Sequence, residues 1–144
     1  GIPEGVNDAF FDLVRNGKPT ADWVAIWNGR FAQLVAAETA GRTDYAKPPA
    51  EKHPSLPNAA YVGTYANDYF GELAVVERDG KLMVTLGPRR TAFPLTPYTR
   101  DVFTFRPPGE NAVGTSGVTF RIGPDGTAAD VTVEHFAAEG WGRF

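Results

Sequence analysis

The spacing of apolar residues changes near Lys47 to Pro57, about a third of the way along the chain, and this change limits the fold most. Before the change, apolar residues recur every three or four positions, as in amphipathic helices. After it, apolar and polar residues alternate, and Gly, Pro, Asn and Asp recur at intervals of roughly 8–12 residues, as in short strands joined by turns. The sequence therefore predicts a helical lead-in over residues 1–46, a Pro-rich linker over residues 47–58 and a β domain over residues 59–144.

The helical lead-in is predicted to contain two helices. The first runs from about Pro3 to Asn16, because Pro suits the first turn of a helix and Gly17 suits the position after its end. The second begins after Thr20 as its N-cap and ends near Gly41. Each carries an apolar stripe, formed by Val6, Phe10, Leu13 and Val14 in the first and by Trp23, Ile26, Trp27, Phe31, Leu34 and Val35 in the second. We expect these stripes to pack on the β domain, on a partner domain or on a second copy of the chain.

The β domain is predicted to be an antiparallel up-and-down β-barrel of seven or eight strands, preceded by the two helices. Connections between the strands are too short for crossover helices, so neighbouring strands must be antiparallel. Asp79-Gly80 predicts a type I′ hairpin turn, and residues 141–144 are placed to close the set of strands. We favour a closed barrel over a two-sheet sandwich, because closure removes exposed strand edges. Bulky residues predicted to face inward favour a filled interior; they are Leu82, Val84, Phe103, Phe105 and Phe120.

Composition excludes several classes of function. The chain of 144 residues is 42% hydrophobic, which is typical of a globular domain, and it has no cysteine for a disulfide, a thiolate metal site or a Cys nucleophile. Its net charge of −3 and its scattered basic residues argue against a nucleic-acid partner. No apolar run approaches the roughly 20 residues that span a bilayer, so no membrane span is predicted. The two histidines are too few for a typical zinc site, and the sequence has no Gly-rich phosphate loop. We therefore predict neither a metal site nor a cofactor.

No catalytic residue is predicted within this chain. Ser55 and Ser116 are the two serines, and neither is followed by Lys at the third position or lies in Gly-x-Ser-x-Gly. Ser55 lies near His53, but the Pro-rich linker around them offers no rigid support and no oxyanion hole. A self-contained hydrolase would need a serine or a carboxylate pair within a cleft, which the sequence does not indicate.

Three residues are candidates for contact with a ligand or a partner. By strand alternation His135 shares a face with Val131 and Val133, which we expect to point into the barrel. A histidine there either is a hydrogen-bonded core residue or binds something inside the barrel. Tyr69 and Phe70 follow a turn signal, so they either cover the barrel end or contact a partner.

The stretch Tyr61-Val62-Gly63-Thr64-Tyr65-Ala66-Asn67-Asp68-Tyr69-Phe70-Gly71-Glu72-Leu73 is the most distinctive part of the sequence. It resembles the opening of the small domain that follows the catalytic domain in class C β-lactamase-related serine hydrolases, a clan that includes D-aminopeptidases and penicillin-binding-protein-like esterases. Later elements follow in the same order as in that small domain: a Gly-containing hairpin, then Asp101-Val102-Phe103-Thr104-Phe105, then Gly117-Val118-Thr119-Phe120. Asp22-Trp23 after Gly17-x-Pro19 resembles the helical segment that joins the two domains.

The resemblance implies a lipocalin-like barrel beside a catalytic domain in the same polypeptide. The family's catalytic Ser, Lys and Tyr belong to that other domain, and no position here matches their motifs. The expected function is that of a non-catalytic accessory C-terminal domain, periplasmic or secreted, which shapes substrate access or takes part in oligomer contacts through the helices. The alternative is a lipocalin-like binding module for a small apolar ligand, which would require an open interior.

Overall fold

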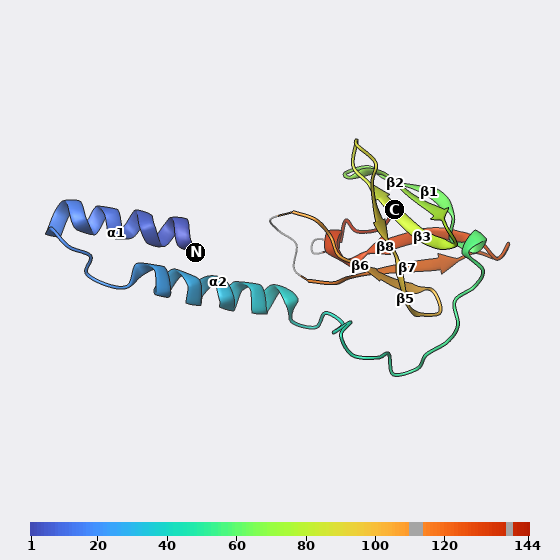
Figure 1. Ribbon diagram of the computed structural model, residues 1–144, viewed down its shortest axis with the longest axis horizontal. Helices are drawn as coiled ribbons and strands as arrows, with labels where there is room; N and C mark the ends of the chain where they lie inside the picture. The colour runs from blue at the N-terminus through green and yellow to red at the C-terminus, as the bar shows by residue number, and fades with distance from the viewer. Residues whose placement is uncertain (110–113, 138–139) are drawn as a thin grey trace. The chain divides into compact units, whose positions relative to one another are not determined.

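The computed structural model describes residues 1–109, 114–137 and 140–144, which form two compact units. Gly1–Arg42 make up a helical unit, and Thr43–Phe144 make up a β unit. Figure 1 shows the helices in the first unit and the strands in the second. No helix in the described part of the chain is long and apolar enough to cross a bilayer.

The helical unit consists of α1 (Ile2–Asn16) and α2 (Trp23–Thr39), joined by a short connection. The first helix matches its predicted bounds, and Gly17 follows it in the left-handed conformation with φ 72°. The predicted N-cap of the second helix was wrong. Asp22 caps α2 by accepting a hydrogen bond from the backbone N–H of Ala25 at 3.0 Å, whereas Thr20 is engaged by the Asp12 carboxylate.

The two helices pack antiparallel (Figure 1). Their interface is partly polar. Trp23 donates its indole N–H to Asp12 at 2.7 Å, and Trp27 donates its own to Asp8 at 2.8 Å. Gly5 approaches the second helix so closely that an added Cβ would lie 2.7 Å from an α-carbon there. Both tryptophans thus serve packing within the hairpin.

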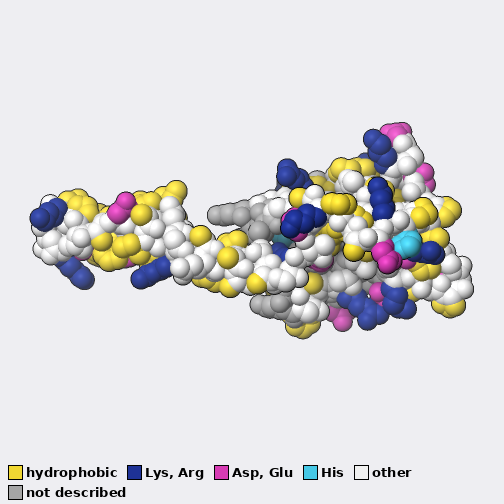
Figure 2. Space-filling model, turned by 90° about the horizontal axis from the view of Figure 1, so that it is seen from below, with side chains coloured by type: hydrophobic (Ala, Val, Ile, Leu, Met, Phe, Trp, Pro, Cys, Tyr) yellow, Lys and Arg dark blue, Asp and Glu magenta, His cyan; other side chains and the backbone are white. Residues whose placement is uncertain are grey.

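Much of the apolar surface of the helical unit is exposed. Exposed large side chains are Ile2, Val6, Phe10, Phe11, Leu13 and Val14 of α1 and Ile26, Phe31, Leu34 and Val35 of α2. Figure 2 shows hydrophobic side chains gathered on the visible face of this unit.

The β unit contains eight antiparallel strands in two four-stranded sheets (Figure 1). The first sheet has the order β1 (Gly63–Asn67), β2 (Gly71–Arg78), β3 (Lys81–Leu86) and β4 (Thr91–Pro94). The second has the order β5 (Thr96–Thr99), β6 (Val102–Phe105), β7 (Ser116–Ile122) and β8 (Ala128–Val133). Two short 3₁₀ helices, η1 (Asn58–Ala60) and η2 (Glu134–Phe136), flank this arrangement. Asp79 and Gly80 both have positive φ, which confirms the predicted type I′ turn.

The predicted closed barrel is wrong, because the two sheets are not joined by a continuous ladder in the described residues. At one junction Pro94 and Pro97 lack N–H groups, and Leu95 between them bonds back to β3, with its N–H on the carbonyl of Leu82 at 2.9 Å. At the other junction the C-terminal segment occupies the outer edge of β8. Phe144 exchanges both of its backbone hydrogen bonds with Val131.

A side chain completes the second junction in place of a strand pair. The amide of Asn67, at the end of β1, donates to the carbonyl oxygens of Trp141 and Arg143, each at 2.7 Å. The C-terminal segment, residues 140–144, therefore lies between the two sheets at this edge. It pairs with β8 by backbone and with β1 through one side chain.

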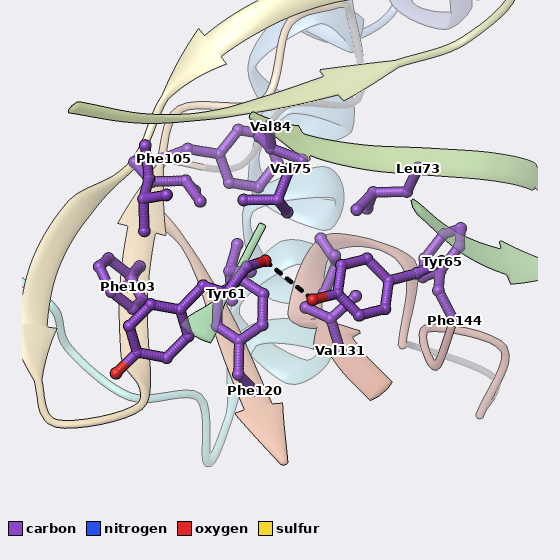
Figure 3. Packing of buried hydrophobic residues seen from close by; sticks show 14 residues of the cluster. Tyr61, Tyr65, Leu73, Val75, Val84, Phe103, Phe105, Phe120, Val131 and Phe144 are labelled. Carbon is purple, nitrogen blue, oxygen red and sulfur yellow. Dashed lines mark hydrogen bonds between the residues drawn. The ribbon is translucent and has the colours of Figure 1, made fainter. Parts of the chain in front are cut away.

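The interior of the β unit is filled with side chains, as the sequence predicted. All five residues expected to point inward are buried. Tyr61 is 0% exposed, and its ring lies 4.9 Å from the ring of Phe103 and 5.0 Å from that of Phe120 (Figure 3). The Tyr65 hydroxyl donates to the Tyr61 carbonyl at 2.8 Å, the bond drawn in Figure 3. Gly63 lies against the Tyr65 ring, so the distinctive Tyr-x-Gly-x-Tyr stretch serves core packing.

The Pro-rich segment is tied to β5, the edge strand of the second sheet. The Tyr98 hydroxyl donates to the carbonyl of Lys47 at 3.0 Å. The Thr99 hydroxyl donates to the carbonyl of Glu51 at 3.0 Å and accepts from the backbone N–H of His53 at 3.2 Å. The segment therefore follows an otherwise open sheet edge as part of the β unit.

Candidate functional site at one end of the β unit

Six aromatic side chains gather at one end of the β unit. This end holds the β1–β2 turn, the β3–β4 turn, η2 and the C-terminal segment. We call the six residues the aromatic cluster; they are Tyr69, Phe70, His135, Phe136, Trp141 and Phe144. The three candidate contact residues from the sequence, Tyr69, Phe70 and His135, all lie in it.

Asn67 positions the two aromatic residues of the β1–β2 turn. Its side-chain oxygen accepts hydrogen bonds from the backbone N–H groups of Tyr69, at 2.8 Å, and of Phe70, at 3.0 Å. Its amide nitrogen holds the C-terminal segment, as described above. One side chain thus fixes the turn and the segment next to each other, so the rings they carry meet in a defined geometry.

The outer part of the aromatic cluster faces solvent. Tyr69 is 72% exposed and stacks on Trp141, which is 53% exposed, with 5.8 Å between the ring centroids. We call these two residues the Tyr69–Trp141 pair. Beneath it Phe70 packs against Phe136 at 4.6 Å and against Phe144 at 6.2 Å. The exposed pair is therefore supported by rings that reach down to the core.

His135 does not point into the core on the face of Val131 and Val133, so that expectation was wrong. Strand β8 ends at Val133, and the chain turns into η2, where His135 is half-buried with its ring 5.0 Å from Phe136. The backbone N–H of His135 donates to the Ser116 hydroxyl at 3.0 Å. This bond replaces a ladder hydrogen bond and ends the alternation on which the prediction depended.

A hollow of about 500 Å³ opens between the aromatic cluster and the ends of β3 and β4. We call it the end hollow. Its apolar lining consists of Phe70, Leu86, Phe93, Phe136 and Phe144, and its other lining residues are Glu72, Gly87, Arg89, Thr91, Pro108 and His135. Phe93 lies 6.1 Å from Phe105, a buried core ring, so the end hollow lies above the filled interior.

Of the two arginines near the end hollow, one is paired with a carboxylate and the other, among the residues that the structure describes, is not. Arg90 lies 3.4 Å from Glu72, and both side chains are largely exposed. Within the described part of the chain, Arg89 has no hydrogen-bond or ion-pair partner. The rim therefore carries one uncompensated guanidinium group next to an apolar surface.

The carboxylate of Asp130 holds the C-terminal segment from the other side. It pairs with Arg121 of β7 and with Arg143 of the segment, the latter at 2.7 Å. Burial alone would raise the pKa of Asp130, but hydrogen bonds and charges from the two arginines outweigh it and lower this pKa. The carboxylate is therefore ionised at neutral pH and fastens the segment to the second sheet.

Two tyrosines, the buried Tyr61 and the partly buried Tyr45, have strongly raised pKa values. Burial raises the pKa of Tyr61 to about 12, helped by the bond from its hydroxyl to Asp101 at 2.9 Å. Burial and the Glu134 carboxylate, 2.5 Å away, raise the pKa of Tyr45. Both hydroxyls stay protonated near neutral pH and act as structural donors, which makes them unsuited to act as general bases.

The serines and histidines do not combine into a nucleophile and base in the described residues. Ser116 is buried, and its hydroxyl accepts a hydrogen bond from the backbone N–H of His135. His53 is exposed, and its Nε2 lies 3.3 Å from the Glu51 carboxylate. Within residues 1–109, 114–137 and 140–144, no group of three His, Asp or Glu side chains is placed to hold a metal ion.

Comparison with known families identifies the β unit. Residues 47–142 match the family described as a domain of unknown function, DUF3471. This chain belongs to that family. The DUF3471 domain is a C-terminal domain of β-lactamase-related proteins, which confirms the resemblance found in the sequence.

A solved structure agrees with this assignment. The DUF3471 chain is similar to the crystal structure of the C-terminal domain of penicillin binding protein Rv0907, with 37% identity and a TM-score of 0.59. The match covers 68% of this chain and 92% of that one. No curated protein matches the chain.

Sequence reasoning found half of the aromatic cluster and missed the rest. Phe136 was missed because a continuing strand was expected where η2 forms. Trp141 and Phe144 were assigned to a closing strand, and nothing in their spacing showed that Asn67 would hold them beside the turn. The end hollow was missed because Leu86 and Phe93 read as ordinary alternating strand residues.

Proposed function

We propose that this chain is a non-catalytic accessory C-terminal domain of a penicillin-binding or β-lactamase-related serine hydrolase that acts outside the cytoplasm. The observation that carries the proposal is the 37% identity to the C-terminal domain of a penicillin binding protein over most of that domain. Membership of the DUF3471 family over residues 47–142 supports it. The helical unit would join the β unit to the catalytic domain of the same polypeptide.

The Tyr69–Trp141 pair is the proposed contact with the catalytic domain. Both rings are largely exposed, yet hydrogen bonds from Asn67 fix the turn and the segment that carry them. Tyr and Trp supply large contact areas at low entropic cost and are enriched among residues that dominate interface energies. A rigid aromatic pair at this end suits a surface that packs beside an active-site entrance and limits substrate access.

Oligomer contact through the helices is the second part of this proposal. The exposed apolar side chains of α1 and α2 form a surface that would be covered in the complete protein. The alternative of a ligand held in the middle of the β unit has less support, because the core rings fill that space.

Activity measurements on two proteins test the proposal. The chain alone is expected to show no turnover of chromogenic esters or β-lactams and no acylation by labelled penicillin. The polypeptide that contains its catalytic domain is expected to show acylation at a serine in Ser-x-x-Lys, outside this chain. Turnover by the chain alone that is lost on Ser116→Ala or Ser55→Ala would refute the proposal.

A variant series tests the contact. Trp141→Ala and Tyr69→Ala are expected to change KM or kcat of the complete polypeptide by about tenfold, because removal of an interface anchor typically costs 1–2 kcal/mol or more. Val62→Ala is the matched control, since Val62 is exposed and precedes β1 at the end of that strand away from Asn67. Equal kinetics in all three variants would show that the pair does not face the catalytic site.

A further inference from the structure

We propose that the end hollow binds the chain of a single-chain anionic amphiphile, with its carboxylate on Arg89. The end hollow of about 500 Å³ is within the range of small-molecule sites, which are mostly apolar with a few polar groups that fix orientation. This inference does not depend on the role of the Tyr69–Trp141 pair.

The lining selects an apolar chain. Five large apolar side chains, three of them phenylalanines from the aromatic cluster, line the end hollow. Leu86 and Phe93 come from the neighbouring strands β3 and β4 and are only partly buried. An acyl chain placed between them would cover apolar surface that is now in contact with water.

The rim selects a negative headgroup. Glu72 would repel an anion, but Arg90 lies beside it and balances its charge. Arg89 has no partner in the described residues and lines the same hollow. A guanidinium group binds a carboxylate through paired N–H donors, so the headgroup would bind the Arg89 guanidinium at the entrance.

The β3–β4 turn keeps this arrangement in place. Arg90 has φ 47°, a conformation that is unfavourable for a residue with a Cβ atom, and its N–H donates to the carbonyl of Gly87 at 2.9 Å. In this turn Arg90 lies against Glu72, whereas Arg89 lines the end hollow without an ion-pair partner in the described residues. Adjacent arginines therefore have different roles, one balancing an acid and the other free for a ligand.

Displacement of cis-parinaric acid from the 144-residue chain by unlabelled fatty acids is the test. We expect saturable binding, with affinity rising about fourfold for each added methylene from octanoate to dodecanoate until the end hollow is filled. Dodecanol, which has no charge, is expected to bind the native chain about three- to tenfold more weakly than dodecanoate. No saturable binding, or affinity that does not depend on chain length, would overturn the proposal.

Three variants locate the site. Arg89→Gln is expected to weaken dodecanoate about three- to tenfold and to leave dodecanol unchanged, whereas Arg78→Gln, at an exposed arginine in β2, changes neither. Thr91→Trp places a ring at the wall of the end hollow and is expected to abolish binding with an unchanged melting temperature. If Phe10→Ser in α1 abolishes binding and Thr91→Trp does not, the ligand lies on the helices and the proposal is wrong.

Discussion

Asn67 ties the β1–β2 turn to the C-terminal segment, and replacing it should loosen the aromatic end of the β unit. Its side chain makes four hydrogen bonds, two to N–H groups in the turn and two to carbonyl groups in the C-terminal segment. At about 0.5–1 kcal/mol for each bond in a half-exposed site, Asn67→Ala should cost about 2–4 kcal/mol of unfolding free energy. For a domain near 100 residues that loss lowers Tm by about 10–20 °C.

Asn67→Asp separates the two halves of this role. An aspartate can still accept the N–H groups of Tyr69 and Phe70, but it has no donor for the carbonyls of Trp141 and Arg143. We expect a loss of about 2 kcal/mol at neutral pH from two lost bonds and the repulsion between the carboxylate and two carbonyl oxygens. Amide hydrogen exchange of residues 142–144 should accelerate, while the β1–β2 turn stays protected.

Thermal unfolding followed by near-UV circular dichroism, together with hydrogen exchange, gives the measurement. Asn58→Ala is the matched control, because Asn58 donates one side-chain bond, at 3.0 Å, to the carbonyl of Gly80 at the opposite end of the β unit. It should cost about 1 kcal/mol and leave exchange at residues 142–144 unchanged. A native-like Tm in Asn67→Ala, or equal exchange at the C-terminal segment in Asn67→Asp and the native chain, would refute the reasoning.

Three further perturbations test the packing around the site. Tyr61→Phe should cost about 1–3 kcal/mol in urea unfolding, because it removes a buried hydroxyl that bonds to Asp101; a loss under about 0.5 kcal/mol would contradict the assigned network. Gly117→Ala should cost about 2 kcal/mol or more, since its Cβ would overlap the Tyr45 hydroxyl; unchanged stability would show that Tyr45 is not seated there. The lowered pKa of Asp130 stabilises the fold above its unfolded pKa of about 3.9, and this contribution is lost as pH falls through the lower folded value. Asp130→Asn should flatten the dependence of unfolding free energy on pH in that acidic range. An unaltered dependence would show that the ion pairs of Asp130 do not stabilise the fold.

The sequence was sufficient where local chemistry decides the structure. Alternation identified the strands that carry Leu82, Val84 and Phe120, and Asp79-Gly80 predicted its turn because both residues tolerate positive φ. The first helix was bounded by Pro3 and Gly17 for equally local reasons. The family resemblance rested on residues whose role is structural, and comparison confirmed it.

The sequence failed where distant segments compete for the same edge. Whether β1 or the C-terminal segment pairs with β8 depends on contacts between residues that are far apart in the chain, such as Asn67 and Arg143. The same competition replaced the closed barrel with two sheets. Likewise the turn at His135 depends on the Ser116 hydroxyl, and the free guanidinium of Arg89 depends on how Arg90 meets Glu72. None of these pairings has a local signature.

Hydrogen exchange of the complete polypeptide, compared with this chain alone, tests most directly whether the domain packs beside a catalytic domain through its aromatic end. The account predicts slower exchange in the complete polypeptide at the β1–β2 turn and at residues 141–144, with no change at the opposite end around Asp79-Gly80. Equal exchange at the aromatic end in both proteins, or protection confined to the Asp79-Gly80 end, would contradict it.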